Sequence, residues 1–320
     1  MKKIMVIGAY GQIGSELVIA LRKNYGDDNV VVTGIRTESD KASLNSGGPF
    51  EAVDVTNIEA IADIVKKYDI DTVYHLAALL SAVGEKNPQL CWETNMGGLY
   101  NVLEIARQYK LTRVFWPSSM AVFESEIPHD KASQDTLLCP KNMYGITKSS
   151  GELLCDYYFK RFGVDVRGVR YPGIISSGAP PGGGTTDYAV AIFYEAIREK
   201  KYTCFLKEDT VLPMMYMPDC IRAAMQLMEA DLSRIKHHSN FNVTAMSFSP
   251  RELTAEIRQH IPDFTCEYKP DFIQEIADSW PRSMDDSAAR EEWGWKPEYN
   301  IGEMVTDMLG KIKIKLLGGV

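Results

Sequence analysis

The chain has 320 residues, of which 45% are hydrophobic and 24% charged, so it can build one large domain or two coupled domains without disulfide or metal staples. Its 35 basic and 43 acidic residues give a net charge of −8, which disfavours a nucleic-acid partner. No run of about 18 apolar residues occurs, and the six cysteines form no CxxC pair. We therefore expect a cytoplasmic protein with no membrane contact, no disulfide and no metal site.

Strand-like and helix-like segments alternate along the first 175 residues. We expect strands within residues 3–7, 29–35, 50–55, 71–78, 113–119 and 164–175. We expect helices over residues 11–25, 58–68, 89–110 and 144–162. This alternation predicts an α/β fold with a doubly wound parallel sheet, which binds ligands at the carboxyl ends of its strands.

The pattern changes after residue 172. A loop rich in glycine and proline over residues 178–184 precedes a predicted helix over 187–200, and prolines then interrupt short mixed elements. We expect residues 1–173 to form a dinucleotide-binding domain, to which residues 218–244 return with a further strand near 240–244. Residues 174–217 and 245–310 are expected to form a smaller substrate-binding cap, followed by a tail over 311–320.

A glycine-rich turn follows the first predicted strand. Gly8, Gly11 and Gly14 stand in a GxxGxxG pattern that opens the first helix. We expect Gly8 to make the tight turn, Gly11 to let the backbone approach a pyrophosphate, and Gly14 to let the helix pack closely on the sheet. The alternative, three glycines in an ordinary turn, is disfavoured by the placement between a strand and a helix.

The acidic residue that normally holds the adenosine ribose is missing. About 20 residues beyond the glycines the chain has Gly34, and Arg36 follows, so a 2′-phosphate could be tolerated and the preference for NAD over NADP is open at this stage. Asp54, with Val55, follows the third strand and could contact the adenine, although an aspartate at a strand end is more often a turn residue.

A YxxxK motif begins the predicted helix over residues 144–162. Tyr144 and Lys148 share one face of that helix, and Ser119 ends the fifth predicted strand. Together they suit alcohol oxidation: Tyr144 takes the hydroxyl proton as hydride leaves the carbon, and Ser119 bonds the developing carbonyl oxygen. Lys148 holds a ribose hydroxyl and stabilises the phenolate. By itself, YxxxK occurs by chance on many helices.

The electrostatic requirement of this chemistry can be bounded. Lowering the pKa of tyrosine from about 10 to near 7 requires roughly 4 kcal/mol. One cation about 4 Å away, at an effective dielectric constant of about 20, supplies roughly that much. Lys148 and a positively charged nicotinamide ring are both candidates, so no metal is required.

Several motifs together resemble the extended short-chain dehydrogenases, the family of the nucleotide-sugar epimerases. They are GAYGQIG (8–14), HLAA (75–78), PSSMAVF (117–123), YGITK (144–148) and RYPGII (170–175). The stretches FWPSS (115–119), PPGGGTTDYA (180–189), LPMMYM (212–217) and SWP (279–281) are similar to the short-chain type of L-threonine 3-dehydrogenases. The resemblance covers the chain to about residue 310. It implies a Rossmann fold with NAD as cofactor, although the residue that matches Gly34 is usually Asp in this family.

The resemblance also implies a set of site residues. The catalytic residues are Tyr144, Lys148 and Ser119. The cofactor-binding residues are Gly8, Tyr10, Gly11, Gln12, Ile13, Gly14, Arg36, Asp54, Val55, Leu76, Ala77, Ala78, Asn95, Tyr144, Lys148, Tyr171, Gly173 and Ile174. The substrate-binding residues are Ser81, Ser119, Tyr144, Gly184, Thr185, Thr186 and Trp280.

The loop that leads into the helix over 187–200 suits an amino-acid substrate. Backbone amides and hydroxyls at a helix start can hold a carboxylate, contacted here by Thr185 or Thr186. Capping of the helix by threonine and Asp187 is the alternative role, and core packing is equally open for Trp280. The expected reaction is oxidation of L-threonine at its β-carbon by NAD⁺ to 2-amino-3-oxobutanoate, on a route towards glycine, with L-serine at most a weak substrate.

Two other functions share part of this evidence. A nucleotide-sugar epimerase or dehydratase would use the same Ser, Tyr and Lys, but residues 178–187 contain no Lys or Arg for a diphosphate. A dinucleotide sensor without activity would not need the proton-transfer set. Relatives commonly form a homodimer through two long helices, here 89–110 and 144–162. The small residues 97–98 and 149–151 could allow close packing there or leave a monomer.

Overall fold

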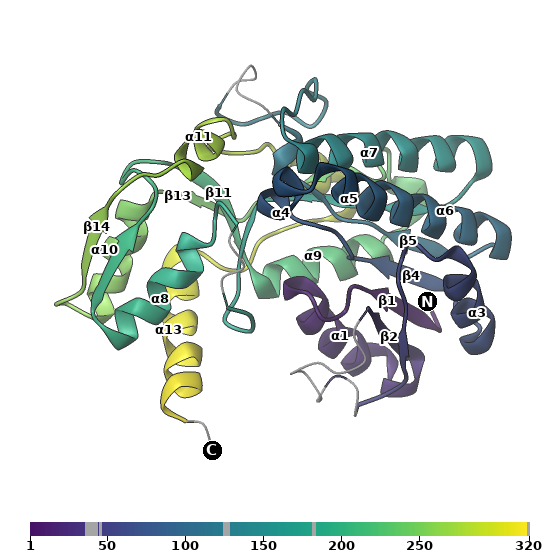
Figure 1. Cartoon of the computed structure of the whole chain (residues 1–320), viewed down its shortest axis with the longest axis horizontal. Coiled ribbons are helices and arrows are strands. Elements are labelled where there is room, and N and C mark those ends of the chain that lie inside the picture. The colour runs from purple at the N-terminus through teal and green to yellow at the C-terminus, as the bar shows by residue number, and fades with distance from the viewer. Residues whose placement is uncertain (36–43, 45–46, 124–128, 181–183, 319–320) are drawn as a thin grey trace. The chain divides into compact units, whose positions relative to one another are not determined.

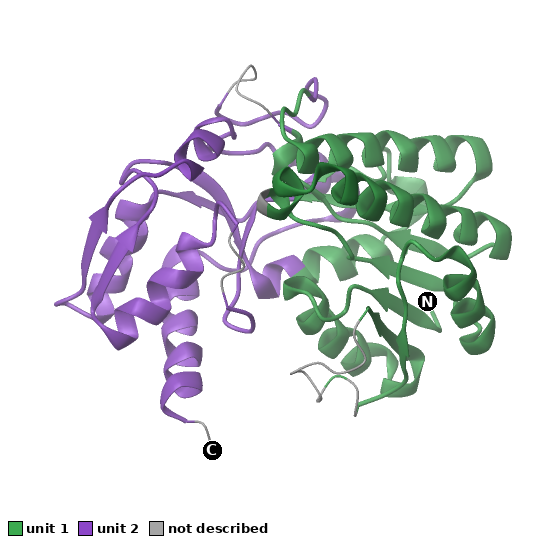
Figure 2. Cartoon of the chain, in the orientation of Figure 1, with its two compact units in different colours: residues 1–122, 139–170, 221–241 green, residues 123–138, 171–220, 242–320 purple. Residues whose placement is uncertain are grey.

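The computed structural model describes residues 1–35, 44, 47–123, 129–180 and 184–318. The chain divides into two compact units, coloured separately in Figure 2. The first comprises residues 1–122, 139–170 and 221–241, and the second comprises residues 123–138, 171–220 and 242–320. Residues 123–138 thus belong to the second unit, whereas the sequence analysis assigned them to the dinucleotide-binding domain. The assignment of ligands to the two units stays a prediction.

The first unit contains a six-stranded parallel sheet. Its spatial order is β3 (Phe50–Ala52), β2 (Val30–Gly34), β1 (Ile4–Ile7), β4 (Thr72–His75), β5 (Arg113–Phe115) and β7 (Val166–Arg167). All adjacent pairs run parallel. The strand order reverses between β1 and β4, which is the switch point at which such sheets bind ligands. The predicted doubly wound fold is confirmed.

Helices cover both faces of this sheet (Figure 1). Met5 and Ile7 of β1 belong to a buried cluster with residues of α3, α6 and α7. The alternate residues of the strand, Ile4 and Val6, are equally buried and point to the other face of the sheet. Burial of both faces explains why the strands are continuous apolar runs. The helical segments of this unit are α1 (Gln12–Tyr25), η1 (Asp27–Asn29), α3 (Ile58–Tyr68), α4 (Ser81–Lys86), α5 (Pro88–Trp92), η2 (Glu93–Gly97), α6 (Gly98–Tyr109), η3 (Met120–Val122), α7 (Met143–Phe162) and η4 (Leu232–Arg234).

Three predicted elements are interrupted. The expected helix over 89–110 contains the π-helical turn η2, so it is not one regular helix. The expected strand over 113–119 breaks after Phe115 and resumes as β6 (Ser118–Ser119). The expected strand over 164–175 is three short strands, because Gly168 lies against the carbonyl of Trp116 and Pro172 has no amide proton. After β7 these are β8 (Val169–Tyr171) and β9 (Gly173–Ile175), each in a different sheet.

The second unit contains short strands and helices. The elements are α8 (Tyr188–Arg198), β10 (Lys201–Cys204), β11 (Leu212–Tyr216), β13 (Met246–Phe248), α10 (Pro250–His260), β14 (Thr265–Tyr268), α11 (Ile273–Asp278), α12 (Ser287–Trp293) and α13 (Ile301–Leu317). Strands β13, β11 and β9 form one small sheet, and β10 pairs with β14. The predicted tail over 311–320 continues α13 to Leu317.

Three elements span the points where the chain passes from one unit to the other. They are β8, α9 (Met217–Glu229) and β12 (Phe241–Asn242). Strand β12 is the only part of the expected strand near 240–244 that forms, and it joins a sheet with β8 and β6.

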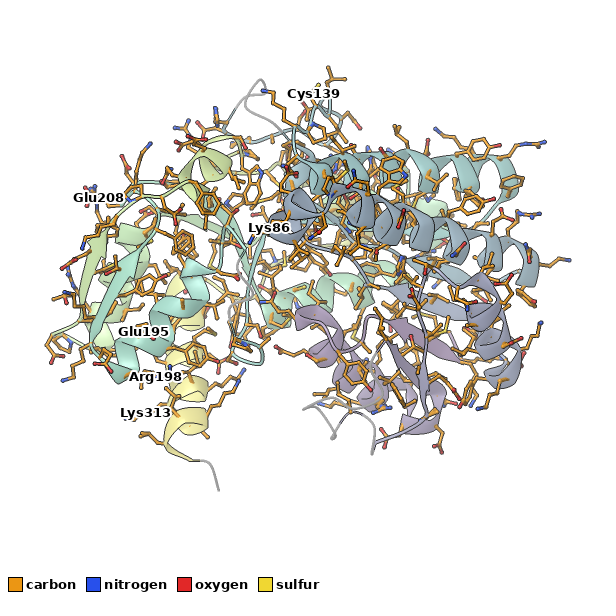
Figure 3. The ribbon with its side chains drawn as sticks, viewed as in Figure 1. Lys86, Cys139, Glu195, Arg198, Glu208 and Lys313 are labelled. Atoms are coloured by element: carbon orange, nitrogen blue, oxygen red, sulfur yellow. The ribbon has the colours of Figure 1, made fainter. Side chains whose placement is uncertain are left out.

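All six cysteines are free thiols. Cys139, on the segment before α7, is exposed and is labelled in Figure 3, while Cys91 and Cys155 are buried. Among the described residues no group of three metal-ligating side chains is found. Within the same residues, every helix is too short or too polar to span a lipid bilayer.

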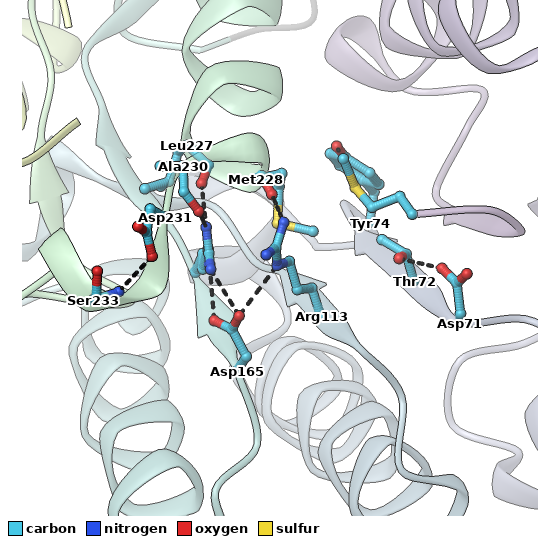
Figure 4. Close-up of polar contacts among 12 residues, drawn as sticks. Asp71, Thr72, Tyr74, Arg113, Asp165, Leu227, Met228, Ala230, Asp231 and Ser233 are labelled. Atoms are coloured by element: carbon cyan, nitrogen blue, oxygen red, sulfur yellow. Dashed lines mark hydrogen bonds and ion pairs between the residues drawn. The ribbon is translucent and has the colours of Figure 1, made fainter. Parts of the chain in front are cut away.

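A buried ion network ties the sheet of the first unit to the end of α9 (Figure 4). Arg167 is fully buried and donates two hydrogen bonds of 2.8 Å to the carboxylate of Asp165. It also donates to the carbonyls of Leu227 and Ala230 at 2.8 and 2.7 Å. Arg113 reaches the same carboxylate at 3.2 Å. The four hydrogen bonds of this buried guanidinium and the ion pair of Arg113 tie β5, β7 and the end of α9 together.

Removing this guanidinium should be costly. We expect Arg167→Met to lower the free energy of unfolding by about 3–5 kcal/mol, because Asp165 would keep only the partly exposed Arg113. Urea denaturation measures the change. The control Lys160→Met breaks the exposed ion pair with Asp156, whose N–O distance of 2.6 Å is similar to that of the buried pair. This control should leave the denaturation midpoint unchanged. Equal effects of the two substitutions would contradict this account.

Candidate active site

The glycine-rich turn has the geometry that its spacing predicts. Gly8 has φ +81°, a conformation that favours glycine, and a Cβ there would lie 2.6 Å from the amide nitrogen of Ala77. A Cβ on Gly14 would lie 2.4 Å from the carbonyl oxygen of Gly8, so α1 packs as closely on the turn as expected. Gly11 is exposed, and no side chain caps the N-terminus of α1. This leaves an open helix end, which suits an anionic group.

The missing acidic residue at the end of β2 has a structural counterpart. The ring of Tyr10 lies over Gly34, where a Cβ would come within 2.6 Å of a ring carbon. The same ring packs edge-on against Phe50, with 5.9 Å between the centroids. Tyr10 therefore occupies the space that a longer residue at position 34 would need. Arg36, the other residue predicted to bear on this contact, lies outside the described residues.

A second loop lies beside the glycine-rich turn and follows β4. The amide of Leu76 donates to the carbonyl of Ile7 at 2.8 Å, and Ala77 and Ala78 continue the loop, both half-buried. Asn95, in the π-helical turn η2, accepts from the amide of Leu79 at 2.8 Å and donates to its carbonyl at 3.1 Å. The structure gives Asn95 a role in fixing this loop, while its contact with a cofactor stays a prediction.

Asp54 and Val55 have local roles after β3. The carboxylate of exposed Asp54 accepts from the amide and the hydroxyl of Thr56 at 2.9 and 2.8 Å. This is the turn role that the sequence analysis named as the commoner one. The side chain of Val55 is buried against Gly98, where a Cβ would lie 2.7 Å from a Val55 methyl carbon.

Helix α7 brings the three predicted catalytic side chains together. Asn142 caps the helix by accepting from the amide of Gly145, so the first turn carries Tyr144. The Ser119 side chain interacts with the Tyr144 phenol and lowers its pKa. The ammonium of Lys148 donates to the carbonyl of Pro117 at 2.6 Å, and it lies 5.6 Å from the centre of the Tyr144 ring.

Two glycines allow this close approach. A Cβ on Gly145 would lie 2.3 Å from the carbonyl oxygen of Ala121, and one on Gly151 would lie 2.3 Å from the ring of Trp116. The α7 backbone therefore sits against the chain segment that carries Ser119. The small residues Gly98 and Gly151, for which the sequence left two roles open, pack inside the first unit.

The ionisation of these groups is governed by burial. Burial raises the pKa of Tyr144 to about 12, and the interaction with Ser119 offsets only part of that rise. Burial lowers the pKa of Lys148 to about 8. Both groups are desolvated together, and burial disfavours the charged form of each. Of the two cations that the sequence analysis named, Lys148 is therefore opposed by burial, and the effect of a nicotinamide charge stays a prediction.

His75, at the end of β4, is a site residue whose electrostatic role the sequence did not reveal. It is fully buried, and neither ring nitrogen has a partner among the residues that the structure describes. Burial, together with the charge of Lys148, lowers the pKa of His75 to about 3. A neutral imidazole therefore faces the ammonium, and His75 adds no second positive charge.

In the second unit, Thr186 and Gly173 lie in contact. A Cβ on Gly173 would lie 2.6 Å from the Thr186 methyl carbon. Thr185 is buried. The carboxylate of Asp187 accepts from the amide of Gly184 at 2.8 Å and makes no side-chain cap on α8. The capping role expected for Asp187 was therefore wrong.

The amides at the start of α8 are largely used inside the helix. Those of Ala189 and Val190 donate to the carbonyls of Thr186 and Asp187 at 3.1 and 3.0 Å. An anion at this position would consequently depend on threonine hydroxyls more than on backbone amides.

Trp280 lines a cavity of about 320 Å³ within the second unit, together with His129, Lys207, Asp209 and Arg282. It is 7% exposed, and its indole nitrogen has no partner among the described residues. A buried indole N–H next to a polar cavity fits a ligand-facing role better than simple core packing.

The remaining predicted residues take simpler positions. Tyr171 is buried, and its hydroxyl donates to the carbonyl of Cys220 at 2.8 Å, so it has a structural partner. Ile174 is half-buried on β9. Ser81 is the first residue of α4, a helix joined to α7 by the 2.5 Å bond from the amide of Met143 to Glu85. Gln12 and Ile13 open α1, half-buried.

The comparisons with known proteins agree with this geometry. A family model described as the NAD dependent epimerase/dehydratase family matches residues 4–243. An uncharacterized epimerase/dehydratase of Staphylococcus haemolyticus (strain JCSC1435) is 49% identical over 316 residues, which cover 98% of this chain and 99% of that protein. The chain belongs to the NAD dependent epimerase/dehydratase family.

Two solved structures in the same comparison are similar over nearly the whole chain. An L-threonine dehydrogenase from Clostridium difficile has 50% sequence identity and a TM-score of 0.97, with 99% of each chain covered. The holo form of an L-threonine dehydrogenase from Cupriavidus necator has 49% identity and a TM-score of 0.94, with 97% of this chain and all of that chain covered.

NAD is the cofactor of this family, and the first unit fits it. The glycine-rich turn leaves no room for side chains at positions 8 and 14 and presents an uncapped helix end for a pyrophosphate. Lys148 is bonded to the carbonyl of Pro117, which follows β5 at the carboxyl edge of the sheet, while its contact with a cofactor ribose stays a prediction.

Proposed function

We propose that this protein oxidises L-threonine at its β-carbon with NAD⁺, giving 2-amino-3-oxobutanoate and NADH, a step towards glycine. The observation that carries the proposal is the assembly of Tyr144, Ser119 and Lys148 in the unit that also contains the glycine-rich turn. The likeness to two L-threonine dehydrogenases at about half identity supports the choice of substrate.

Each residue has a defined part in the proposed reaction. Tyr144 accepts the proton of the substrate hydroxyl, and Ser119, whose side chain interacts with Tyr144, donates to the oxygen as it becomes a carbonyl. Bound NAD⁺ accepts the hydride. Lys148 favours the phenolate, since at 5–6 Å and an effective dielectric constant of about 20 a cation stabilises an anion by roughly 3 kcal/mol. That contribution exists only while Lys148 keeps its proton.

The substrate carboxylate is assigned to the hydroxyls of Thr185 and Thr186. Thr185 is buried and Thr186 packs against Gly173, so both side chains are held in fixed orientations. Ser81 and Trp280 complete the proposed substrate set. L-Serine lacks the methyl group on the β-carbon and should be the poorer substrate, because it buries less apolar surface.

A nucleotide-sugar epimerase or dehydratase is the second candidate, and the name of the Staphylococcus relative favours it. The chain supplies no Lys or Arg over residues 178–187 for a diphosphate, which favours a small substrate.

The substrate proposal predicts NADH formation from L-threonine and its loss in Tyr144→Phe. The phenylalanine keeps the ring but removes the proton acceptor, and we expect kcat to fall by about 10²-fold or more. NADH absorbance measures the rate with L-threonine or L-serine, and chromatography of the sugar nucleotide measures turnover of UDP-glucose, because epimerisation and dehydration regenerate NAD⁺. A wild-type protein that turns over UDP-glucose but not L-threonine would establish the second candidate, and full activity in Tyr144→Phe would refute the assigned base.

We further propose that the chain forms a homodimer through α6 and α7. These helices lie side by side in the first unit (Figure 1). Both carry large apolar side chains in solvent: Tyr100 is 50% exposed, Leu153 is 73% exposed and Tyr157 is 53% exposed. Contiguous exposed apolar groups of this size on two neighbouring helices are typical of a protein interface.

Light scattering should therefore give twice the chain mass of 35.9 kDa. We expect the double substitution Leu153→Arg with Tyr157→Arg to give the monomer mass, because it buries unpaired charge in the interface. Leu232→Arg, an equally drastic change of an exposed leucine in η4, serves as control and should leave the dimer intact. A monomeric wild-type protein would refute the proposal.

A further inference from the structure

A buried ion pair lies one helical turn beyond the predicted catalytic lysine. The carboxylate of Glu152 accepts two hydrogen bonds from Arg170, at 2.9 and 2.8 Å. Glu152 is 4% exposed and Arg170 is 2% exposed. Neither residue belongs to the predicted site, and nothing in the proposed reaction uses them.

The same carboxylate reaches the chain segment that carries Ser119. The hydroxyl of Ser118 donates to Glu152 at 2.6 Å, in a buried position. Three consecutive residues thus interact with three consecutive turns of α7. Pro117 accepts from Lys148, Ser118 donates to Glu152, and the Ser119 side chain interacts with Tyr144.

We propose that Glu152, held by Arg170 and acting through Ser118, is a positioning residue that fixes Ser119 and Lys148 relative to Tyr144. This inference rests on the proposed function. The bond from Ser118 to Glu152 fixes the backbone between Pro117 and Ser119. The Pro117 carbonyl binds the Lys148 ammonium, and the Ser119 hydroxyl lies at the Tyr144 phenol. A displacement of this segment by a fraction of an ångström would move Ser119 away from the reacting oxygen. The reaction rate is sensitive to displacements of this size.

The charge of Glu152 has a second consequence. It raises the pKa of Lys148 against the lowering by burial, and Cys91 and Cys155 act in the same direction. Of the other groups facing Lys148, His75 is neutral and Tyr144 keeps its proton to high pH. Glu152 therefore helps to keep the ammonium protonated in the pH range in which it is needed.

The kinetic test uses Ser118→Ala, which keeps the ion pair and should fold. We expect kcat with L-threonine to fall at least 5-fold, while KM for L-threonine and for NAD⁺ stays within twofold, because the binding groups are unchanged. Ser239→Ala is the matched control, since its buried hydroxyl donates to the Glu152 carbonyl at 3.4 Å without contact to residues 117–119. Its kcat should stay within twofold of wild type.

A second readout requires no substrate. The pKa of Lys148 can be measured by NMR titration of protein labelled with ¹³C at the lysine ε-carbon, and Lys148→Met assigns the signal. In the double variant Glu152→Gln with Arg170→Met, we expect the Lys148 pKa to fall by half a unit or more. The double substitution avoids leaving Arg170 buried without its partner. A wild-type protein inactive on L-threonine would refute the proposed function. The Lys148 titration would still test the role of Glu152, because it needs no substrate. An unchanged Lys148 pKa, or a kcat of Ser118→Ala within twofold of wild type, would overturn the positioning role.

Discussion

The chemistry proposed for this protein depends on one almost fully buried ammonium group. Lys148 is 4% exposed, and its ammonium donates to the carbonyl of Pro117 at 2.6 Å. Burial favours the neutral amine, whereas the role proposed for Lys148 beside the Tyr144 phenol requires the charged form. Partial offsets make this conflict tolerable: the backbone carbonyl, the Trp116 ring at 4.5 Å and the carboxylate of Glu152 one turn away. The arrangement of α7 against residues 117–119 follows from this requirement.

Burial also explains why the phenol is not acidic by itself. Tyr144 and Lys148 share one desolvated site, so the effect that raises the pKa of the phenol also lowers that of the amine. A simple Coulomb argument between two groups misses this coupling because it assumes that the lysine stays charged. A positive charge that enters the site with the cofactor favours the phenolate without depending on Lys148.

Much of the fold could be predicted from the sequence, because its signals are local. The apolar runs, the GxxGxxG turn and the YxxxK spacing each report on one segment, and the parallel sheet follows from their alternation. The interruptions could not be predicted, since they depend on distant contacts. Gly168 breaks a strand because the carbonyl of Trp116 lies against it. Likewise, Gly34 replaces the usual acidic residue where the Tyr10 ring packs, a relation between two loops.

The site divides in the same way. Residue types with distinctive chemistry, such as Tyr144 and Lys148, could be found from spacing. The ion pair behind them could not, because Glu152 resembles any glutamate on a helix until Arg170 and Ser118 are seen against it. The bond from Asp187 to Gly184, in place of a helix cap, likewise depends on the backbone path of one loop.

The most direct test is a titration of the Tyr144 phenol by ultraviolet difference absorbance between wild type and Tyr144→Phe, with and without NAD⁺. Without NAD⁺ we predict no phenolate signal from Tyr144 up to about pH 10, the ordinary tyrosine value, and with saturating NAD⁺ a signal at clearly lower pH. Ionisation of Tyr144 near neutral pH without NAD⁺, or a titration that NAD⁺ leaves unchanged, would contradict the account.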